Sequence, residues 1–210
     1  MTRPRARILF GGSFDPPTRA HRELIEIGLH AFPKAELIVL PAGQAPHKLD
    51  AAPTSSALRL AMARLAFGQH ARVRVSDEEC QQAGPSYTYL TIERHRRELG
   101  ADAELYWLIG SDSLLDFPTW RYPRRILELA QVLTVARPGF DVGALAGLTG
   151  LDRPQKRALR DGILDGAGPP ISSTLVRAKF AAQEDVSRFV EPAVLTFIEE
   201  HGLYTKRGED

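Results

Sequence analysis

The segment from Gly11 to His21 combines residue types that suit the binding of phosphate. Gly12 lets a ligand approach the backbone closely, because glycine has no side chain. Thr18 and His21 are spaced i, i+3, so they face the same way in the first turn of a helix. The start of a helix offers unpaired N–H groups and a positive dipole end, and both attract anions. The segment therefore predicts a phosphate site made by a hydroxyl and an imidazole.

A second segment of the same character lies far along the chain, at 171–177, and reads Ile-Ser-Ser-Thr-Leu-Val-Arg. Ser172 is a favourable N-cap residue, and a helix that starts there leaves the N–H groups of its first turn exposed. Arg177 adds a forked cation one turn later, which suits phosphate oxygens. We expect these two helix starts to point into one cavity and to bind the same polyphosphate.

The charge balance argues against a partner as highly charged as duplex nucleic acid. Lys and Arg number 27 and Asp and Glu 26, which gives a formal net charge of +1. Binding to duplex DNA draws much of its affinity from neutralised phosphates and usually needs a clear excess of basic residues. A local basic pocket for one small anionic ligand is compatible with this balance.

The cysteine content and the apolar runs narrow the class of protein further. The single cysteine, Cys80, cannot form an intrachain disulfide, which favours a reducing compartment. No apolar run approaches the roughly 18 to 20 residues that a membrane helix needs. No CxxC or HExxH spacing occurs, so we predict no metal bound by the protein itself. A cytoplasmic protein that does not enter the membrane is the simplest interpretation.

Short apolar runs bounded by glycine or proline alternate with stretches of helical periodicity. Runs that are apolar on both faces are typical of a parallel sheet covered by helices on each side. The predicted strands are Ile8–Phe10, Leu37–Leu40, Val73–Val75, Leu105–Ile109 and Val132–Val135. This alternation predicts an α/β fold with a doubly wound, Rossmann-like parallel sheet. Within it, Trp107 is expected to lie in the core.

The helices between these strands are predicted from apolar spacing and from capping residues. The first follows Pro17, and the third is expected to run from a cap at Ser86 to a stop at Gly100. The second is capped by residues 54–56, and its expected buried stripe is Leu58, Met62, Leu65 and Ala66.

The last third of the chain differs in character. Residues 138–170 are rich in Gly and Pro, with one helix expected near Pro154–Ile163. Two more helices are expected, one from Ser172 and one over Pro192–His201, which Gly202 ends. We interpret the chain as one domain, with residues 1–137 as the sheet core and residues 138–210 as a small C-terminal helical lobe.

Several of these segments resemble, in order, the motifs of a known family. The Gly-Gly-Ser-Phe-Asp-Pro loop followed by Thr18-Arg-Ala-His21 resembles the (H/T)xGH signature of the nucleotidyltransferase superfamily, and 171–177 resembles its ISST-x-x-R signature. Four further stretches resemble elements of bacterial nicotinate-nucleotide adenylyltransferases: 46–48, 85–88, 110–120 and 203–204. The resemblance covers nearly the whole chain. Thr18 stands where this family usually has histidine, and Ala20 replaces the glycine of the motif.

The resemblance implies a reaction between ATP and nicotinate mononucleotide that yields nicotinate adenine dinucleotide and pyrophosphate. It implies that His21 contacts the ATP phosphates as the catalytic group and that Thr18 donates a hydrogen bond beside it. The other residues expected to bind ATP are Gly12, Ser13, Phe14, Lys48, Gly110, Asp112, Ser172, Ser173 and Arg177.

The second substrate implied by the resemblance has its own predicted residues. Trp120 is expected to stack on the pyridine ring, Thr88 to hydrogen-bond near the carboxylate, and Asp15 to contact the same nucleotide. Relatives often carry an aromatic residue directly after this tryptophan, whereas this chain has Arg121. Mg²⁺ is expected to arrive on the triphosphate with mostly water ligands, since it loses its hydration shell reluctantly.

Three alternatives stay open at this stage. The acceptor of the adenylyl group could be nicotinamide mononucleotide, which the sequence separates poorly from nicotinate mononucleotide. It could be phosphopantetheine, whose adenylyltransferase has the threonine found here at Thr18. The chain could also be a catalytically silent nucleotide sensor that retains the fold. The sequence does not predict an oligomeric state.

Overall fold

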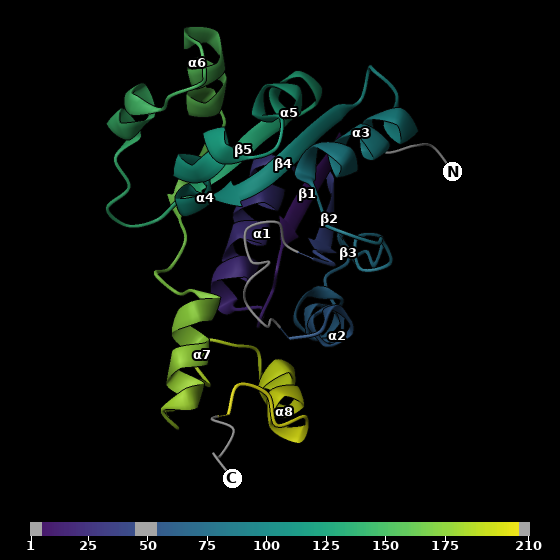
Figure 1. Ribbon diagram of the computed structural model, residues 1–210, viewed down its shortest axis with the longest axis vertical. Coiled ribbons are helices and arrows are strands. Elements are labelled where there is room, and N and C mark those ends of the chain that lie inside the picture. Colours follow the sequence, from purple (N-terminus) through teal and green to yellow (C-terminus); the bar gives the residue numbers. More distant parts are fainter. Residues whose placement is uncertain (1–5, 45–53, 206–210) are drawn as a thin grey trace.

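The computed structural model describes residues 6–44 and 54–205, and these form a six-stranded parallel sheet (Figure 1). The strands are β1 (Ala6–Gly12), β2 (Glu36–Pro41), β3 (Val73–Val75), β4 (Glu104–Gly110), β5 (Gln131–Ala136) and β6 (Ile163–Ala167). Their order across the sheet is β3-β2-β1-β4-β5-β6, and every neighbouring pair is parallel. This is the doubly wound, Rossmann-like order. Strands β2 and β3 are added on one side of β1, and strands β4, β5 and β6 are added on the other, so the strand order reverses between β1 and β4.

Helices cover both faces of the sheet. Helices α1 (Arg19–Ala31), α2 (Ser56–Phe67), α7 (Ser173–Ala181) and α8 (Pro192–Glu200) share one core cluster. Helices α3 (Thr88–Leu99), α4 (Ser111–Asp116), α5 (Pro123–Leu129) and α6 (Arg153–Asp161) share the other. Two short 3-10 helices, η2 (Phe117–Thr119) and η3 (Val142–Gly147), complete the described elements. Figure 1 shows α7 and α8 at the lower end of the molecule.

Side chains of β4 alternate between the two cores with the period of two that a strand imposes. Leu108 packs in the cluster that contains α1, whereas Trp107 and Ile109 pack in the cluster that contains α3. Each of these side chains is almost fully buried. The strand is therefore apolar on both faces, as expected for the centre of a parallel sheet.

The five predicted strands are confirmed, and β6 is a strand that the sequence analysis missed. Residues 163–167 read Ile-Leu-Asp-Gly-Ala and are half-buried or exposed, because β6 lies at the edge of the sheet. An edge strand with a charge and a glycine lacks the continuous apolar run that marks the central strands. The sheet therefore continues beyond residue 137, into the part of the chain predicted to be a helical lobe.

Most predicted helix limits lie close to those observed, with one correction to a cap and one to a buried stripe, and α4 and α5 are helices that the sequence analysis did not predict. Gly100 and Gly202 have positive φ values of 88° and 57° at the ends of α3 and α8. Ser86 is not the cap of α3: the N-cap is Tyr87, and the Ser86 hydroxyl accepts the N–H of Gly43 at 3.0 Å. Leu65 is 40% exposed, so it does not belong to the buried stripe of α2.

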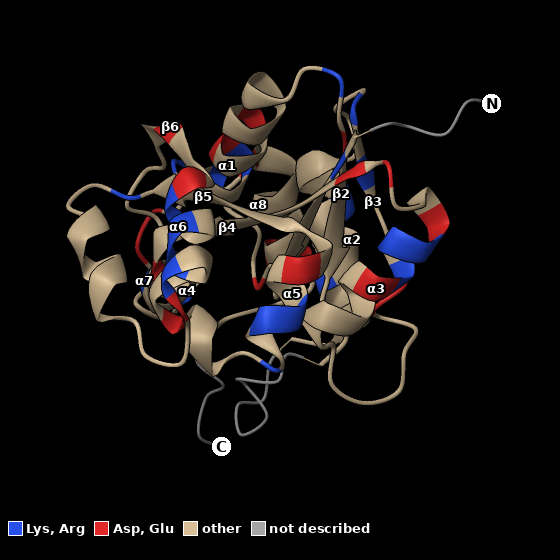
Figure 2. Ribbon diagram, turned by 90° about the horizontal axis from the view of Figure 1, so that it is seen from above, with Lys and Arg blue, Asp and Glu red and all other residues tan. Residues whose placement is uncertain are grey.

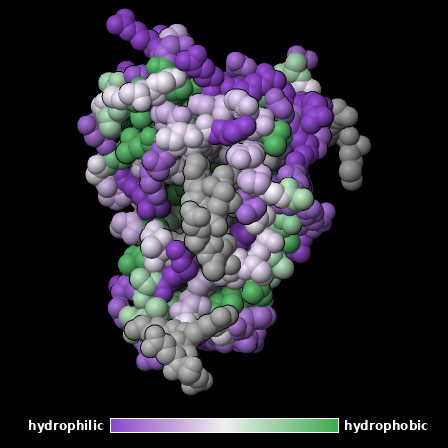
Figure 3. Space-filling model, in the orientation of Figure 1, coloured by the Kyte–Doolittle hydropathy of each residue, from purple (hydrophilic) through white to green (hydrophobic). Residues whose placement is uncertain are grey.

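The surface is mixed in charge and in hydropathy. Basic and acidic residues are interspersed on α3, α5 and α6 in Figure 2. On the face seen in Figure 3, hydrophobic residues form small patches among hydrophilic ones. None of the helices in the described ranges combines the length and the apolar composition that a membrane span requires.

The close packing of the end of β1 against β4 depends on a glycine. A Cβ atom added at Gly11 would lie 2.5 Å from Cη2 of Trp107, far closer than carbon atoms pack. The indole ring is held in the interior of β4 and is 3% exposed, so it has little room to move. Gly11 is thus required for the close approach of Trp107 to the end of β1.

We predict that Gly11→Ala lowers the free energy of unfolding by about 1 to 3 kcal/mol, the usual effect of overpacking a core. A denaturant titration followed by circular dichroism would measure it. Gly147→Ala is the matched control, because a Cβ there meets nothing within 4 Å. Equal stability of the two variants would contradict the packing role of Gly11.

Candidate active site

A cavity of about 710 Å³ opens where the strand order reverses, at the carboxyl ends of β1 and β4. Gly11 and Gly12 line it at the end of β1, and Gly110 lines it at the end of β4. Pockets for small ligands typically measure about 300 to 1,000 Å³. In open α/β sheets the crevice at this reversal is the expected ligand site.

The start of α1 brings Thr18 and His21 together. Thr18 is the N-cap residue, and its backbone N–H donates a hydrogen bond to Nδ1 of His21 at 2.9 Å. Because Nδ1 is then an acceptor, the proton of the neutral imidazole lies on Nε2. His21 lines the cavity, whereas Thr18 is 2% exposed and does not. The threonine therefore positions the histidine and sets its tautomer.

The loop between β1 and α1 places only part of its predicted set in the cavity wall. Gly12 and Ser13 line the cavity. Phe14 does not line it: the side chain is 1% exposed, and its ring packs edge-on against His21 at a centroid distance of 5.2 Å. Phe14 thus supports the imidazole from behind.

The start of α7 reaches the same cavity, as expected. Ser172 caps the helix by accepting the N–H of Leu175 at 3.1 Å, and both Ser172 and Ser173 line the cavity. The Ser173 hydroxyl donates to the carbonyl of Pro16 at 2.8 Å, which ties α7 to the loop before α1. The two helix starts therefore converge on one cavity.

Arg177 and Asp15 have protein partners near this convergence, and neither lines the cavity. The guanidinium of Arg177 donates to the backbone carbonyl of Asp15 at 2.7 Å and to the hydroxyl of Thr174 at 3.3 Å. The carboxylate of Asp15 accepts the phenol of Tyr204 at 2.6 Å. Burial and this hydrogen bond to a carboxylate raise the pKa of Tyr204 well above its ordinary value, so the phenol stays protonated.

The side of the cavity at β4 and β5 contains a charge pair. Gly110 and Asp112 line the cavity as predicted, and so does Arg137, which follows the end of β5. Nε of Arg137 lies 3.0 Å from Oδ1 of Asp112. The sequence analysis missed Arg137, although its position directly after a strand is the same signal that drew attention to Gly110.

Thr88 and Trp120 lie where a second ligand could sit beside the first. Both line the cavity. Thr88 is the first residue of α3, and the ring of Trp120 packs on Phe117 at a centroid distance of 5.4 Å. Lys48, predicted to bind ATP, lies outside the described residues.

Arg59 is a residue of the site region that sequence reasoning missed. Its side chain is buried in α2 and donates to three backbone carbonyls: those of Thr54 at 2.8 Å, Ser13 at 2.8 Å and Gly43 at 2.9 Å. It thereby joins the loop after β1 to the segment after β2. An arginine on a helix normally predicts an exposed position, so the sequence carried no signal for this role.

Glu79 is a second residue that the sequence analysis missed. It lines the cavity, is 3% exposed, and accepts the hydroxyl of Thr91 at 2.6 Å. Burial raises the pKa of this carboxyl, and the neighbouring charge of Glu78 adds to the shift.

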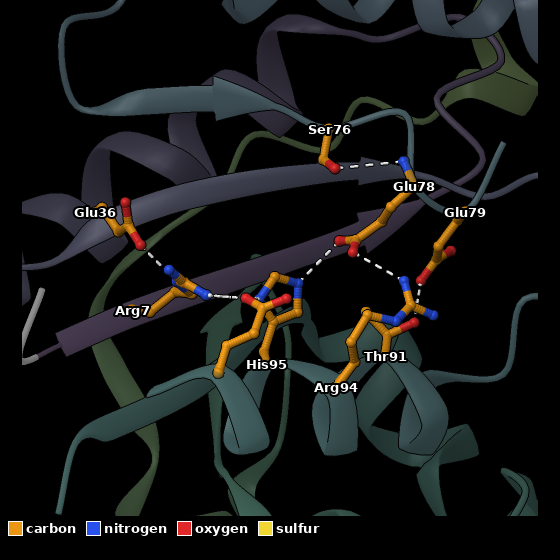
Figure 4. Close-up of polar contacts among 9 residues, drawn as sticks. Arg7, Glu36, Ser76, Glu78, Glu79, Thr91, Arg94 and His95 are labelled. Carbon is orange, nitrogen blue, oxygen red and sulfur yellow. Dashed lines mark hydrogen bonds and ion pairs between the residues drawn. The ribbon is translucent and has the colours of Figure 1, made fainter. Parts of the chain in front are cut away.

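A partly buried network of charged side chains continues from Glu78 to the beginning of β1 (Figure 4). Glu78 contacts Nε2 of His95 and the guanidinium of Arg94, each at 2.9 Å. Nδ1 of His95 lies 2.8 Å from Arg7, which also pairs with Glu36. Burial raises the pKa of Glu78, but the hydrogen bonds and charges of His95 and Arg94 outweigh it, and the net pKa is lowered. His95 is thus a structural residue that joins α3 to β1.

Comparison with known proteins agrees with this geometry. The family model described as Cytidylyltransferase-like matches residues 9–179. A protein of Chromobacterium violaceum with the name "Probable nicotinate-nucleotide adenylyltransferase" is 38% identical, over 95% of this chain and 99% of its own. A Neisseria meningitidis protein of the same name is 37% identical, over 94% and 98%.

Solved structures show the same fold. Plasmodium falciparum nicotinic acid mononucleotide adenylyltransferase complexed with NaAD matches with a TM-score of 0.71 at 19% identity, over 95% of this chain and 97% of that one. The same enzyme complexed with APC matches with a TM-score of 0.70. The fold and the cavity at the strand reversal thus define a cytidylyltransferase-like nucleotidyltransferase. Within that class, the chain belongs to the nicotinate-nucleotide adenylyltransferase family.

The pKa values of Glu78 and Glu79 are shifted in opposite directions, so we predict opposite effects of pH on the stability of variants at these two residues. The pKa of Glu79 is raised by folding, so its contribution is lost as the pH rises through the folded pKa. Glu79→Gln should therefore gain stability relative to the wild type between pH 4 and pH 8. The pKa of Glu78 is lowered, so its contribution is present above the ordinary pKa of 4.5. Glu78→Gln should be less stable than the wild type at pH 7 by about 1 kcal/mol, the difference between a charged and a neutral hydrogen bond.

Denaturant titrations of the three proteins at pH 4, 6 and 8 would measure both trends. The two variants act as controls for each other, because each removes one carboxylate from the same segment. Parallel pH profiles for the two variants would show that the environments of Glu78 and Glu79 are assigned wrongly.

Proposed function

We propose that this chain transfers the adenylyl group of ATP to nicotinate mononucleotide, forming nicotinate adenine dinucleotide and pyrophosphate. The observation that carries the proposal is the convergence of the α1 and α7 helix starts on one cavity at the strand reversal. The family to which the chain belongs supports the same reaction. The cavity draws lining residues from Phe10 to Thr174, so we treat the chain as one nucleotidyltransferase domain.

The reaction needs positioning and charge stabilisation more than proton transfer. An oxygen of the 5′-phosphate of nicotinate mononucleotide attacks the α-phosphorus of ATP in line, and the bond between that phosphorus and the bridging oxygen to the β-phosphate breaks. Pyrophosphate leaves with the electron pair of that bond. The attacking phosphate is already ionised near neutral pH, so no general base is needed. Two anions must be brought together, and helix starts that are already in place can stabilise the charge that develops.

His21 is the residue to which we assign the largest effect on rate. Thr18 holds Nδ1 as an acceptor, which leaves the proton of the neutral ring on Nε2 as a donor. In the cavity this N–H donates to the oxygens of the α- and β-phosphates. Thr18 acts through His21, which differs from the direct contact with phosphate that the family resemblance implied.

We assign the binding of the β- and γ-phosphates, at the far end of the triphosphate, to the start of α7. The N–H groups after Ser172 border the cavity and suit the β- and γ-phosphates, whereas the hydroxyl of Ser173 donates its proton to the carbonyl of Pro16. Arg177 supports this end by holding α7 against the loop before α1. The contact of Lys48 with phosphate stays a prediction.

Nicotinate mononucleotide occupies the part of the cavity lined by Thr88 and Trp120, with the pyridine ring on the indole. Gly110 and Asp112 border the ribose side of ATP, where Asp112 is already paired with Arg137. The carboxylate of Asp15 is engaged by Tyr204, so we now assign Asp15 to the support of the loop.

Mg²⁺ belongs to the reaction as a partner of ATP. The residues at 6–44 and 54–205 form no group of three or more side chains that could hold a metal ion. We expect Mg²⁺ to enter on the triphosphate with mostly water ligands, where it offsets phosphate charge, because it loses its hydration shell reluctantly. The cytoplasmic location predicted from Cys80 stays a prediction.

We predict that His21→Ala lowers kcat by about 10²- to 10³-fold, the scale for loss of one donor to a developing charge. His21→Asn is the sharper variant, because its amide oxygen can replace Nδ1 as acceptor for the N–H of Thr18 while the Nε2 donor is lost. Pyrophosphate release from ATP and Mg²⁺ would be measured with each acceptor, with thermal melting as the check of folding. His30→Ala, on the exposed side of the same helix, is the matched control.

The panel of acceptors distinguishes the remaining alternatives. Nicotinate mononucleotide is expected to be the best substrate, ahead of nicotinamide mononucleotide and phosphopantetheine. A preference for phosphopantetheine would identify a different adenylyltransferase, and nucleotide binding without pyrophosphate release would identify a sensor. Unchanged turnover in both His21 variants would remove the role assigned to that residue.

A further inference from the structure

Arg121 is a cavity residue to which the reaction just described gives no task. It directly follows Trp120, and both line the cavity together with Tyr87 and Thr88. The guanidinium carbon lies 5.6 Å from the ring centroid of Tyr87 and 5.1 Å from that of Tyr122. Both distances fall within the range of a cation–π contact, so two aromatic rings hold the guanidinium.

Arg121 and Arg137 both line the cavity, but they differ in their ion pairs. Arg137 is paired with Asp112 at 3.0 Å. Arg121 forms no ion pair with any residue in the part of the chain that the structure describes. Its aromatic contacts leave the edge of the planar group available, and that edge carries the N–H donors. A cation held by rings at the wall of a cavity is suited to an anionic group of a ligand.

The two candidate mononucleotides differ at one group only, which is a carboxylate in nicotinate and a neutral carboxamide in nicotinamide. Trp120, on which the pyridine ring is proposed to stack, lines the same cavity as Thr88 and Arg121, so the distinguishing group of the ring would face a wall that includes both. A guanidinium matches a carboxylate with two parallel N–H···O bonds, whereas a carboxamide offers one oxygen acceptor and no charge.

We propose that Arg121 binds the carboxylate of the nicotinate ring and determines the preference for nicotinate over nicotinamide mononucleotide. This proposal rests on the proposed function. The start of α3 adds to the same effect. Its N-cap, Tyr87, makes no side-chain capping bond, and Thr88 begins the helix at the cavity wall. The positive end of α3 and the guanidinium of Arg121 therefore favour an anion at the same place.

The test compares kcat/KM for the two mononucleotides in the wild type and in Arg121→Gln. The value for nicotinate mononucleotide is expected to fall about 10- to 100-fold, as for loss of a charged hydrogen-bonded pair. The value for nicotinamide mononucleotide should change less than about 3-fold, and the KM for ATP should be unchanged. Arg121→Lys keeps the charge but loses the forked geometry, so an intermediate ratio is expected.

Arg124→Gln is the matched control, because it removes the same charge from the exposed side of α5, where Arg124 contacts the carbonyl of Gly150. Its ratio between the two substrates should equal that of the wild type. An equal loss for both mononucleotides in Arg121→Gln, or no loss for either, would leave the ratio unchanged and would overturn the proposal. A wild-type protein that releases pyrophosphate with neither mononucleotide would instead overturn the proposed function, and the assignment of Arg121 with it.

Discussion

The hydrogen bonds between α7 and the loop after β1 hold together two segments that are 157 positions apart in the chain. The Ser173 hydroxyl donates to the carbonyl of Pro16, and Arg177 donates to the carbonyl of Asp15. These carbonyls directly precede the start of α1, so the bonds set the place of one helix start relative to the other. In the proposed reaction, a triphosphate bridges the two positive ends, and these hydrogen bonds set the spacing that it must span.

The loop itself is held from several directions, which explains why so few of its side chains are available to a ligand. Arg59 reaches the carbonyl of Ser13 from α2, and Tyr204 reaches the carboxylate of Asp15 from the C-terminal segment. Phe14 packs between Phe10 and Phe67, at centroid distances of 5.4 and 5.7 Å. Residues that resemble ligand contacts in the sequence thus serve to fix the backbone that makes the contact. A backbone fixed in advance needs no rearrangement when charge develops in the reaction.

Several of the charged side chains around the cavity are paired with each other or buried. Arg137 is paired with Asp112, and the buried carboxyl of Glu79 has a raised pKa. In the proposed reaction, phosphate is attracted by the helix starts and by His21, whose tautomer is set by the N-cap residue Thr18. Thr18 does this through its backbone N–H, and its hydroxyl also lies 2.8 Å from Nδ1 of His21. The departure from the usual motif at this position is thus compatible with the chemistry.

The sequence by itself determined many of the helices and strands and the kind of site that they build. Apolar runs, caps such as Ser172 and stops such as Gly202 act within one turn or one strand, so their effects can be read locally. Tertiary structure decided which side chains reach the cavity. Arg177 finds a carbonyl 162 positions away, and Arg59 is buried because three backbone carbonyls converge on it. The edge strand β6 exists because β5 offers it a partner. Such partners lie far apart in the chain and meet only in the folded molecule, so no local pattern encodes them.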